Sequence, residues 1–345
     1  MKIFILTILF ILFSRNIYSN NIFDTPFYNI EFTSTNIEDD KILSINEIKI
    51  KSISSIFKNT LSEKDYLNIN NQLTDDLINT FIKNIIINDE KIVNNKYLSK
   101  IKVNFDKQKI IDFYRSNKIP YVEYHPSNFL LIIYEINELN NNLFSKNNNH
   151  YKFFNENKKN INLFKIPNLD INDRFILKNE DIIKRDLNKI NKFSNKYNSI
   201  ENIIVIAKND KDKTNYNLIM NSNGNFLEKK LILNKNEMDL FYKKLEKETL
   251  ELWKQINKIQ NENLNFLNCD ISYFNMLELK EIRNNLSNVS IINNLIKKKL
   301  SYKSISYEIY FYGNFKILIK IFEQNKLKIN YYEDVCTIKL IWLSK

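Results

Sequence analysis

The residues Phe129-Leu130-Leu131-Ile132-Ile133-Tyr134-Glu135-Ile136 form a continuous, largely apolar run. A run of this length without polar alternation is typical of a strand that is buried on both faces of a sheet. Ile203 to Ala207 is a second run of this kind, and residues 179–197 between the two carry apolar residues at helical spacing. The sequence therefore predicts a mixed α/β body built around residues 129–136.

Shorter patterns predict the other elements of this body. Asn223-Gly224 separates two strand-like runs and is a strong hairpin signal. Asn236 and Asp239 resemble a capping box at the start of an amphipathic helix. The resulting prediction is a loop at 140–160, a strand at 162–166, a hairpin of strands 214–220 and 226–233, and a helix at 236–259.

A proline-marked segment precedes this body. Lys118 to Ser127 contains Pro120 and Pro126, which are half of the prolines in the chain. Proline lacks an amide donor and disfavours helix at the residue before it, so this segment is the best domain boundary in the sequence.

The residues before the proline-marked segment predict a small α+β domain with the order βααββα. Its elements are a strand at 28–32, helices at 38–60 and 73–84, a hairpin turned by Asn94-Asn95 with a second strand at 97–105, and a helix capped by Asp106.

The last part of the chain predicts a ferredoxin-like unit with the order βαββαβ. Its elements are expected at 264–271, 275–286, 289–298, 303–312, 314–324 and 327–342, with a break near Asp334 in the last strand. The first and last strands are neighbours in this topology, and they carry Cys269 and Cys336. A disulfide between them is geometrically allowed, and two buried free thiols are the alternative.

The fold class is therefore α+β, with three small mixed α/β modules in tandem after a signal peptide. The expected boundaries are 1–19 for the signal peptide, then 20–117, 118–260 and 261–345.

The first residues have the pattern of a secretory signal. Lys2 precedes the apolar stretch Ile3–Phe13, and small residues follow, with cleavage expected after Ser19. An uncleaved N-terminal anchor is the alternative. No later segment is long and apolar enough to span a bilayer. We therefore expect an exported, periplasmic protein.

Composition excludes several classes of site. The 345 residues include only two glycines and two histidines, so phosphate-binding glycine loops and zinc motifs of the usual kind are absent from the sequence. We expect no cofactor and no metal.

The net charge of +11 comes almost entirely from lysine. The chain has five arginines, and its longest run of lysines is Lys297-Lys298-Lys299. Scattered lysines favour a solvated basic surface over a nucleic-acid site.

Few side chains qualify as functional candidates. The paired carboxylates Asp39-Asp40, Asp75-Asp76 and Glu333-Asp334 are better explained by helix starts and turns than by catalysis. His125 has no identifiable nucleophile or orienting partner, and Trp253 is interpreted as a core residue rather than a ligand platform. Arg283, Tyr310 and Tyr312 are candidate interface residues, against a surface ion pair for Arg283 and the plain second face of a sheet for the two tyrosines.

Several stretches, in order, carry a family resemblance. They are Pro26–Phe32 after the signal, the Tyr97–Phe105 strand with its following helix, Ile119-Pro120-Tyr121 before the 129–136 strand, Leu252-Trp253-Lys254, Leu279–Leu286 and Tyr312-Gly313. In this the chain resembles the domain of unknown function 2066 family of alphaproteobacterial envelope proteins. The resemblance spans nearly the whole chain after the signal and implies an envelope setting. It brings no established catalytic residues.

These observations predict a non-catalytic periplasmic protein that acts by binding envelope proteins or in envelope assembly. We expect neither a nucleic-acid partner nor a transmembrane span after removal of the signal, while peripheral membrane contact stays open. Two alternatives remain, namely an exported hydrolase with an unrecognised carboxylate site and a binder of anionic lipid or polymer.

Overall fold

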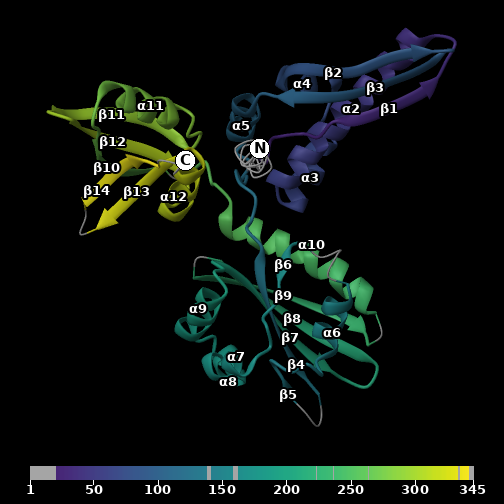
Figure 1. Cartoon of the computed structure of the whole chain (residues 1–345), viewed down its shortest axis with the longest axis vertical. Helices are drawn as coiled ribbons and strands as arrows, with labels where there is room; N and C mark the ends of the chain where they lie inside the picture. Colours follow the sequence, from purple (N-terminus) through teal and green to yellow (C-terminus); the bar gives the residue numbers. More distant parts are fainter. Residues whose placement is uncertain are drawn as a thin grey trace, which may run out of the picture.

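The computed structural model describes residues 21–137, 141–157, 162–222, 224–235, 237–262, 264–332 and 335–341. These residues form three sheets, each with its own helices, so the predicted α+β class is confirmed. Figure 1 shows the first module (residues 21–117) and the third (264–341) at one end of the molecule and the second (118–262) at the other. The predicted signal peptide and its cleavage after Ser19 lie outside the described residues. No helix in the described part of the chain is long and apolar enough to cross a membrane.

The first module is a three-stranded antiparallel sheet with helices against one face. The strand order is β1 (Tyr28–Thr33), β3 (Lys96–Phe105), β2 (Ile82–Val93). Along β3 the side chains of Tyr97, Ile101 and Val103 are fully buried, as are Ile53 and Phe57 on the long helix that packs against this strand. The helices are α2 (Ile37–Thr60), α3 (Glu63–Asn70), α4 (Asp75–Phe81) and α5 (Lys107–Ser116).

Two details of the first module differ from the prediction. Ser62 caps an additional helix, α3, through a hydrogen bond from the backbone of Asp65. The helix expected at 73–84 ends at Phe81, because Ile82 adopts extended backbone and starts β2. Asp106 does cap α5, as expected, by accepting from the backbone of Gln108 and Lys109.

The second module is a mixed sheet covered on both faces. The central strands β4 (Phe129–Ile136) and β7 (Glu201–Asn209) run parallel, and β8 (Lys213–Ser222) and β9 (Asn225–Asn234) continue the sheet antiparallel. The helix α10 (Met238–Asn257) packs on β8 and β9, and α6 (Asn149–Glu156) lies against it through stacked Phe153 and Tyr242. Because both faces are covered, β4 is buried up to Glu135 and the first half of β7 is buried, as the apolar runs predict.

Irregular parts of the second module depart from the prediction. The expected loop at 140–160 contains α6 and the short strand β5 (Asn141–Asn142), while β6 (Phe164–Lys165) lies beside β4. The expected helix at 179–197 is two helices, α8 (Asn179–Lys184) and α9 (Leu187–Lys196). Arg185 between them is left-handed, with φ 57°, and Asp186 caps the second. A further short helix, α7 (Ile171–Ile176), precedes them. The predicted turn and capping residues Asn223 and Asn236 lie outside the described residues.

The third module confirms most of the ferredoxin-like order and changes its last strand. The elements are β10 (Leu264–Ser272), α11 (Met276–Ser287), β11 (Ile292–Ser301), β12 (Ser304–Tyr312), α12 (Phe315–Gln324), β13 (Leu327–Tyr332) and β14 (Val335–Leu340). The sheet order is β11-β12-β10-β14-β13. The last predicted strand is thus a hairpin, whose second strand inserts parallel to β10 and leaves β13 at the edge. The predicted break at Asp334 falls outside the described residues.

The inserted strand brings the two cysteines together. Cys269 on β10 lies directly opposite Cys336 on β14, with their Cα atoms 4.4 Å apart, and their Sγ atoms form a disulfide. Both residues are buried on the helix-covered face of the sheet. The bond closes a loop with a sequence separation of 67 residues and joins the central strand β10 to its neighbour β14.

Reduction of the Cys269–Cys336 bond is expected to lower the free energy of unfolding of the third module by about 4 kcal/mol, because a loop of this length gains much chain entropy when it is opened. Urea unfolding of the same chain with and without reductant measures this difference. Because no residue is replaced, the two forms have the same side chains in the core. Identical transitions for the oxidised and reduced chain would contradict the prediction.

Candidate functional site

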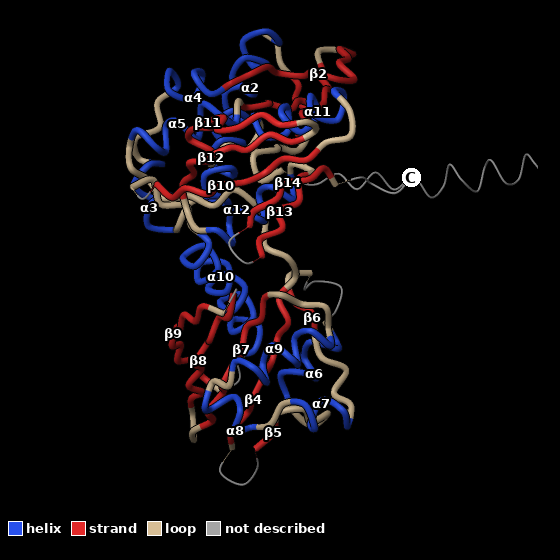
Figure 2. Tube along the Cα trace, turned by 90° about the vertical axis from the view of Figure 1, so that its left-hand side faces the viewer, coloured by secondary structure: helices blue, strands red, loops and turns tan. Residues whose placement is uncertain are grey.

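The middle of the proline-marked segment, residues 121–124, is buried between the modules. Tyr121, Val122, Glu123 and Tyr124 are all at most 3% exposed. The backbone of Tyr121 pairs with that of Ile259, which follows α10, and the N–H of Val122 donates to the carbonyl of Thr60 at the end of α2. We call this meeting place the junction. Figure 2 shows α10 leading into it from the second module.

Glu201 is the buried acid of the junction. Its side chain is fully enclosed at the start of β7. Oε1 accepts from Trp253 Nε1 at 2.8 Å and from Lys320 Nζ at 3.0 Å, and Ser222 Oγ lies at 3.1 Å. Trp253 comes from α10 and Lys320 from α12 of the third module. One carboxylate therefore joins the second module to the third.

Asn257 and Tyr124 extend this network. Asn257 Nδ2 donates to Ser222 Oγ at 3.2 Å, and Tyr124 OH donates to Asn257 Oδ1 at 2.9 Å. The ring of Tyr124 packs edge-on against Trp253 and lies 5.2 Å from Lys320 Nζ. Burial raises the pKa of Tyr124, so its hydroxyl stays protonated as a donor.

A second buried acid links the first and third modules. Glu123 pairs with Lys107 Nζ of α5 at 2.5 Å and accepts from Ser290 Oγ, which lies just before β11. Arg115 of α5 crosses the same boundary. It donates to the carbonyl of Ser290 at 2.6 Å, and its guanidinium lies 4.8 Å from the ring centre of Tyr312.

Lys254 joins the first module to α10. Its Nζ donates to the carbonyls of Lys58 and Leu61 at 2.7 and 2.9 Å, which occupies acceptors at the end of α2. It also pairs with Glu251 at 3.0 Å. A lysine that satisfies the carbonyl end of a helix is favourable, because that end carries partial negative charge.

A cavity of about 680 Å³ opens beside these contacts, between α2, α3, the segment before β4 and α10. Its apolar surface comes from five side chains and a proline ring: Ile22, Tyr66, Leu67, Pro126, Leu163 and Leu250. Trp253 and Lys254 lie at its wall, so the cavity is built directly on the junction. We call it the junction cavity.

Charges of both signs surround the junction cavity: Lys58, Glu63, Lys243, Glu246, Lys247 and Glu251. Lys247 Nζ lies 2.6 Å from Glu63 Oε1, and this hydrogen bond raises the pKa of the Lys247 ammonium. Glu251 accepts from the backbone N–H of Glu63 at 2.9 Å, which ties the start of α3 to α10. An apolar interior with a polar rim is the usual anatomy of a site that binds another molecule by desolvation.

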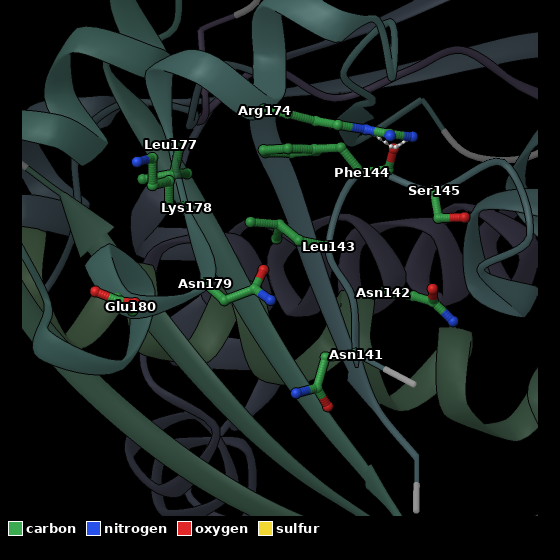
Figure 3. A pocket seen from close by; sticks show the side chains of 10 residues that line it. All are labelled: Asn141, Asn142, Leu143, Phe144, Ser145, Arg174, Leu177, Lys178, Asn179 and Glu180. Atoms are coloured by element: carbon green, nitrogen blue, oxygen red, sulfur yellow. Dashed lines mark hydrogen bonds between the residues drawn. The ribbon is translucent and has the colours of Figure 1, made fainter. Parts of the chain in front are cut away.

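Figure 3 shows a second pocket, at the far end of the second module. It is a polar hollow of about 440 Å³ that includes Asn141, Asn142 and Asn179. Arg174 is its one arginine, and both Nε and Nη2 donate to the carbonyl of Phe144, at 3.2 and 3.0 Å. Arg174 thus holds the loop after β5, and the pocket offers no convergent set of charged groups.

A buried acid and histidine also meet in the second module. His150 Nδ1 lies 4.0 Å from Glu135 Oε2, and His150 Nε2 lies 3.3 Å from Tyr216 OH. Burial lowers the pKa of His150 to about 4 and raises that of Tyr216 to about 12. Glu135 also accepts from the side chain of Asn209 and the backbone of Asn149. Both side chains are buried, and neither lines the junction cavity or the pocket in Figure 3.

The residues that were singled out from the sequence as functional candidates lie in different parts of the structure. Trp253 is buried in the junction, as its interpretation as a core residue requires, and His125 is an exposed neighbour on the rim of the junction cavity. Tyr312 contacts Arg115 across modules. Tyr310 lies on the open face of the third sheet beside Phe266 and donates to Glu308. Arg283 is exposed on α11, away from the contacts just described.

Among the paired carboxylates, Asp39-Asp40 and Asp75-Asp76 occupy the first turns of α2 and α4, where helix-start charge explains them. Glu333-Asp334 lies outside the described residues. No functional or structural role was predicted from the sequence for the residues that form the contacts of the junction, namely Glu123, Glu201, Lys254, Arg115 and Lys320.

No group of three His, Cys, Asp or Glu side chains converges as a metal site within the described ranges. Comparison of the chain with protein-family profiles, with curated proteins and with solved structures finds no match.

The replacement Glu201→Ala is expected to lower the free energy of unfolding by about 3 kcal/mol, because it leaves the Lys320 ammonium and the Trp253 indole N–H without their acceptor inside the junction. Glu201→Gln keeps the side-chain shape and one acceptor oxygen, so it is expected to lower the free energy of unfolding by less. Urea unfolding followed by Trp253 fluorescence provides the values. A loss below about 1 kcal/mol for the alanine variant would show that the network is not a structural constraint.

His150 is expected to make the fold acid-sensitive. The folded protein binds the proton less tightly than the unfolded chain, so stability falls as the pH drops below about 6.5, and the loss is complete below about 4. Between pH 7 and pH 5 the loss is about 2 kcal/mol. Unfolding curves at several pH values should show this slope in the parent and lose most of it in His150→Gln. The His125→Gln control should keep most of the slope, since burial lowers the pKa of His125 as well. An unchanged slope in His150→Gln would contradict the assignment.

Proposed function

We propose that this protein is an exported, non-catalytic binding protein of the bacterial cell envelope, which holds an apolar segment of a partner protein in the junction cavity. The observation that carries the proposal is the cavity itself, formed jointly by the first module, the buried segment before β4 and α10. Its volume lies within the range of sites that enclose a ligand or a peptide side-chain cluster.

The lining supports a peptide partner over a small polar ligand. Leu67 and Leu250 present apolar surface from two different modules, and the ion pair of Lys247 with Glu63 lies at the rim between them. Paired charges around an apolar centre complement a segment that carries both apolar and charged residues. Burial of such a segment would draw on both modules at once.

Two features support the envelope setting. The N-terminal sequence has the order of a secretory signal, and the third module carries a disulfide, a bond that persists in oxidising compartments. The resemblance to the domain of unknown function 2066 family points the same way and is part of the proposal.

The absence of catalytic geometry in the described residues favours binding over hydrolysis. Glu201 Oε1 is bonded to a lysine, an indole N–H and a serine hydroxyl, and Glu123 Oε1 is bonded to a lysine and a serine hydroxyl, while Glu123 Oε2 has no hydrogen-bond partner among the described residues. Neither acid has a second catalytic group placed to work with it on a substrate, which favours binding.

The proposal is tested with a photo-crosslinking side chain at Leu67, which also lines the junction cavity, activated in intact cells and followed by purification and mass spectrometry of bound proteins and lipids. Leu250→Asp is expected to reduce recovery of the bound protein about tenfold or more, because a charge in an apolar contact removes a main anchor. Leu240→Asp on the same helix is the matched control, since Leu240 is exposed outside the cavity lining.

Recovery of one envelope protein that is lost in Leu250→Asp and kept in Leu240→Asp supports the proposal. Equal recovery with both variants, or recovery of a lipid alone at Leu67, overturns it. Fluorescence of Trp253, measured with Trp342 replaced by Phe so that one tryptophan remains, establishes that the variants keep the junction intact.

A further inference from the structure

The third module carries an exposed apolar tip. The tip consists of the loop from β10 to α11 with the first two residues of α11, and of the end of β11 with the turn to β12. A hydrogen bond from the N–H of Tyr273 to the carbonyl of Lys303, at 3.1 Å, joins the two segments. Five large side chains of these two segments are between 62% and 90% exposed: Phe274, Met276, Leu277, Leu300 and Tyr302. Single exposed apolar residues are ordinary on proteins, whereas five on two adjoining segments mark an interaction site.

The loop of the tip is held in place by the fold. Glu278 is buried, and its carboxylate accepts from the backbone N–H of Phe274 at 2.6 Å. Asn275 in turn accepts from the N–H of Glu278 at 2.9 Å and caps α11. Phe274, Met276 and Leu277 are therefore exposed on an ordered helix start.

The tip points away from the rest of the molecule. The opposite end of the same sheet is docked at the junction, where Ser290 and Tyr312 contact Arg115. Figure 1 shows the β11–β12 hairpin projecting from the third module on the side away from the first and second. Nothing within the described chain covers this end.

The unpaired charge on the two segments of the tip is positive, although Asp270, Glu278 and Glu308 lie next to these segments. Residues 272–277 and 295–306 together contain four lysines and no acidic residue. Lys298 pairs with Glu308 on the sheet face, whereas Lys297, Lys299 and Lys303 are exposed and form no ion pair with the described residues. Lys303 Nζ lies 5.4 Å from the ring centre of Tyr302, so a cation sits directly beside the most exposed aromatic side chain.

We infer that the apolar tip docks this protein on a membrane surface that contains anionic phospholipid. Tyr302, Phe274 and Leu277 would enter the region between headgroups and acyl chains, where aromatic and aliphatic side chains are stabilised. The three unpaired lysines would meet the lipid phosphates, which attract basic residues near the surface. This inference is independent of the proposed function, because the tip and the junction cavity lie on different parts of the molecule.

A lipid surface fits the tip better than a protein partner does. The apolar side chains stand on a projecting hairpin and a neighbouring helix start, which suits shallow insertion into a continuous apolar phase. The flanking lysines have no acidic companions on these segments, whereas protein interfaces usually mix charges of both signs around the apolar centre, as the rim of the junction cavity does.

The test places a fluorescent reporter in the tip of the full chain. Tyr302→Trp is mixed with vesicles of phosphatidylcholine alone or with phosphatidylglycerol, and its emission is compared with that of the parent chain. Ile232→Trp on β9 of the second module is the matched control, because Ile232 is also an exposed apolar residue. The reporter is needed because the apolar residues Ile3–Phe13 are present in every variant and could bind vesicles by themselves.

The inference requires a blue shift of the Trp emission, and quenching by brominated acyl chains, for Tyr302→Trp on anionic vesicles and not for Ile232→Trp. Lys299→Gln and Lys303→Gln in the reporter chain are each expected to lower the affinity for these vesicles about fivefold. The inference is overturned if the reporter does not respond to vesicles, or if it responds equally to neutral ones. It is also overturned if the reporter shifts only in the presence of a protein partner.

Discussion

The carboxylate of Glu201 is the constraint on which the arrangement of the three modules depends. A fully buried carboxylate is costly unless donors surround it. Here the donors come from α10, β8 and α12, so the acid is satisfied only when the second and third modules are docked. Glu123 does the same for the first and third modules through Lys107 and Ser290. The junction cavity lies where Lys254 and Glu251 of α10 bond the end of α2 and the start of α3.

Elements whose burial follows a simple pattern could be predicted from the sequence, and those set by distant packing could not. The apolar run of β4, the alternation of β3 and the order of the third module all appear in the structure. The helix break at Arg185 could not be recognised from the sequence, because the left-handed residue there is not a glycine. The position of β14 beside β10 could not be predicted either, because it depends on the packing of the whole sheet. The prolines did mark the joint, but the apolar residues Tyr121, Val122 and Tyr124 were the sign that it is buried. Glu201 was not identified because its partners Trp253 and Lys320 are 52 and 119 residues away.

The junction cavity and the apolar tip lie at different places in the molecule and have different proposed roles. A docked junction would present the cavity between the first and second modules as one preformed site, which lowers the entropic cost of binding. The apolar tip of the third module lies at the end of a sheet whose other end is anchored by Arg115 and Glu123. A rigid junction would therefore hold the cavity at a set distance from the surface on which the tip rests.

The most direct test of the docked junction is the distance distribution between spin labels on the second and third modules, which Glu201 joins. Lys192→Cys on α9 and Asn284→Cys on α11 place labels at exposed positions, with the Cys269–Cys336 disulfide kept oxidised. A docked junction predicts one narrow distribution in the parent and a broader one when Glu201→Ala is added. A broad distribution in the parent would contradict docking, because the second and third modules would then move independently.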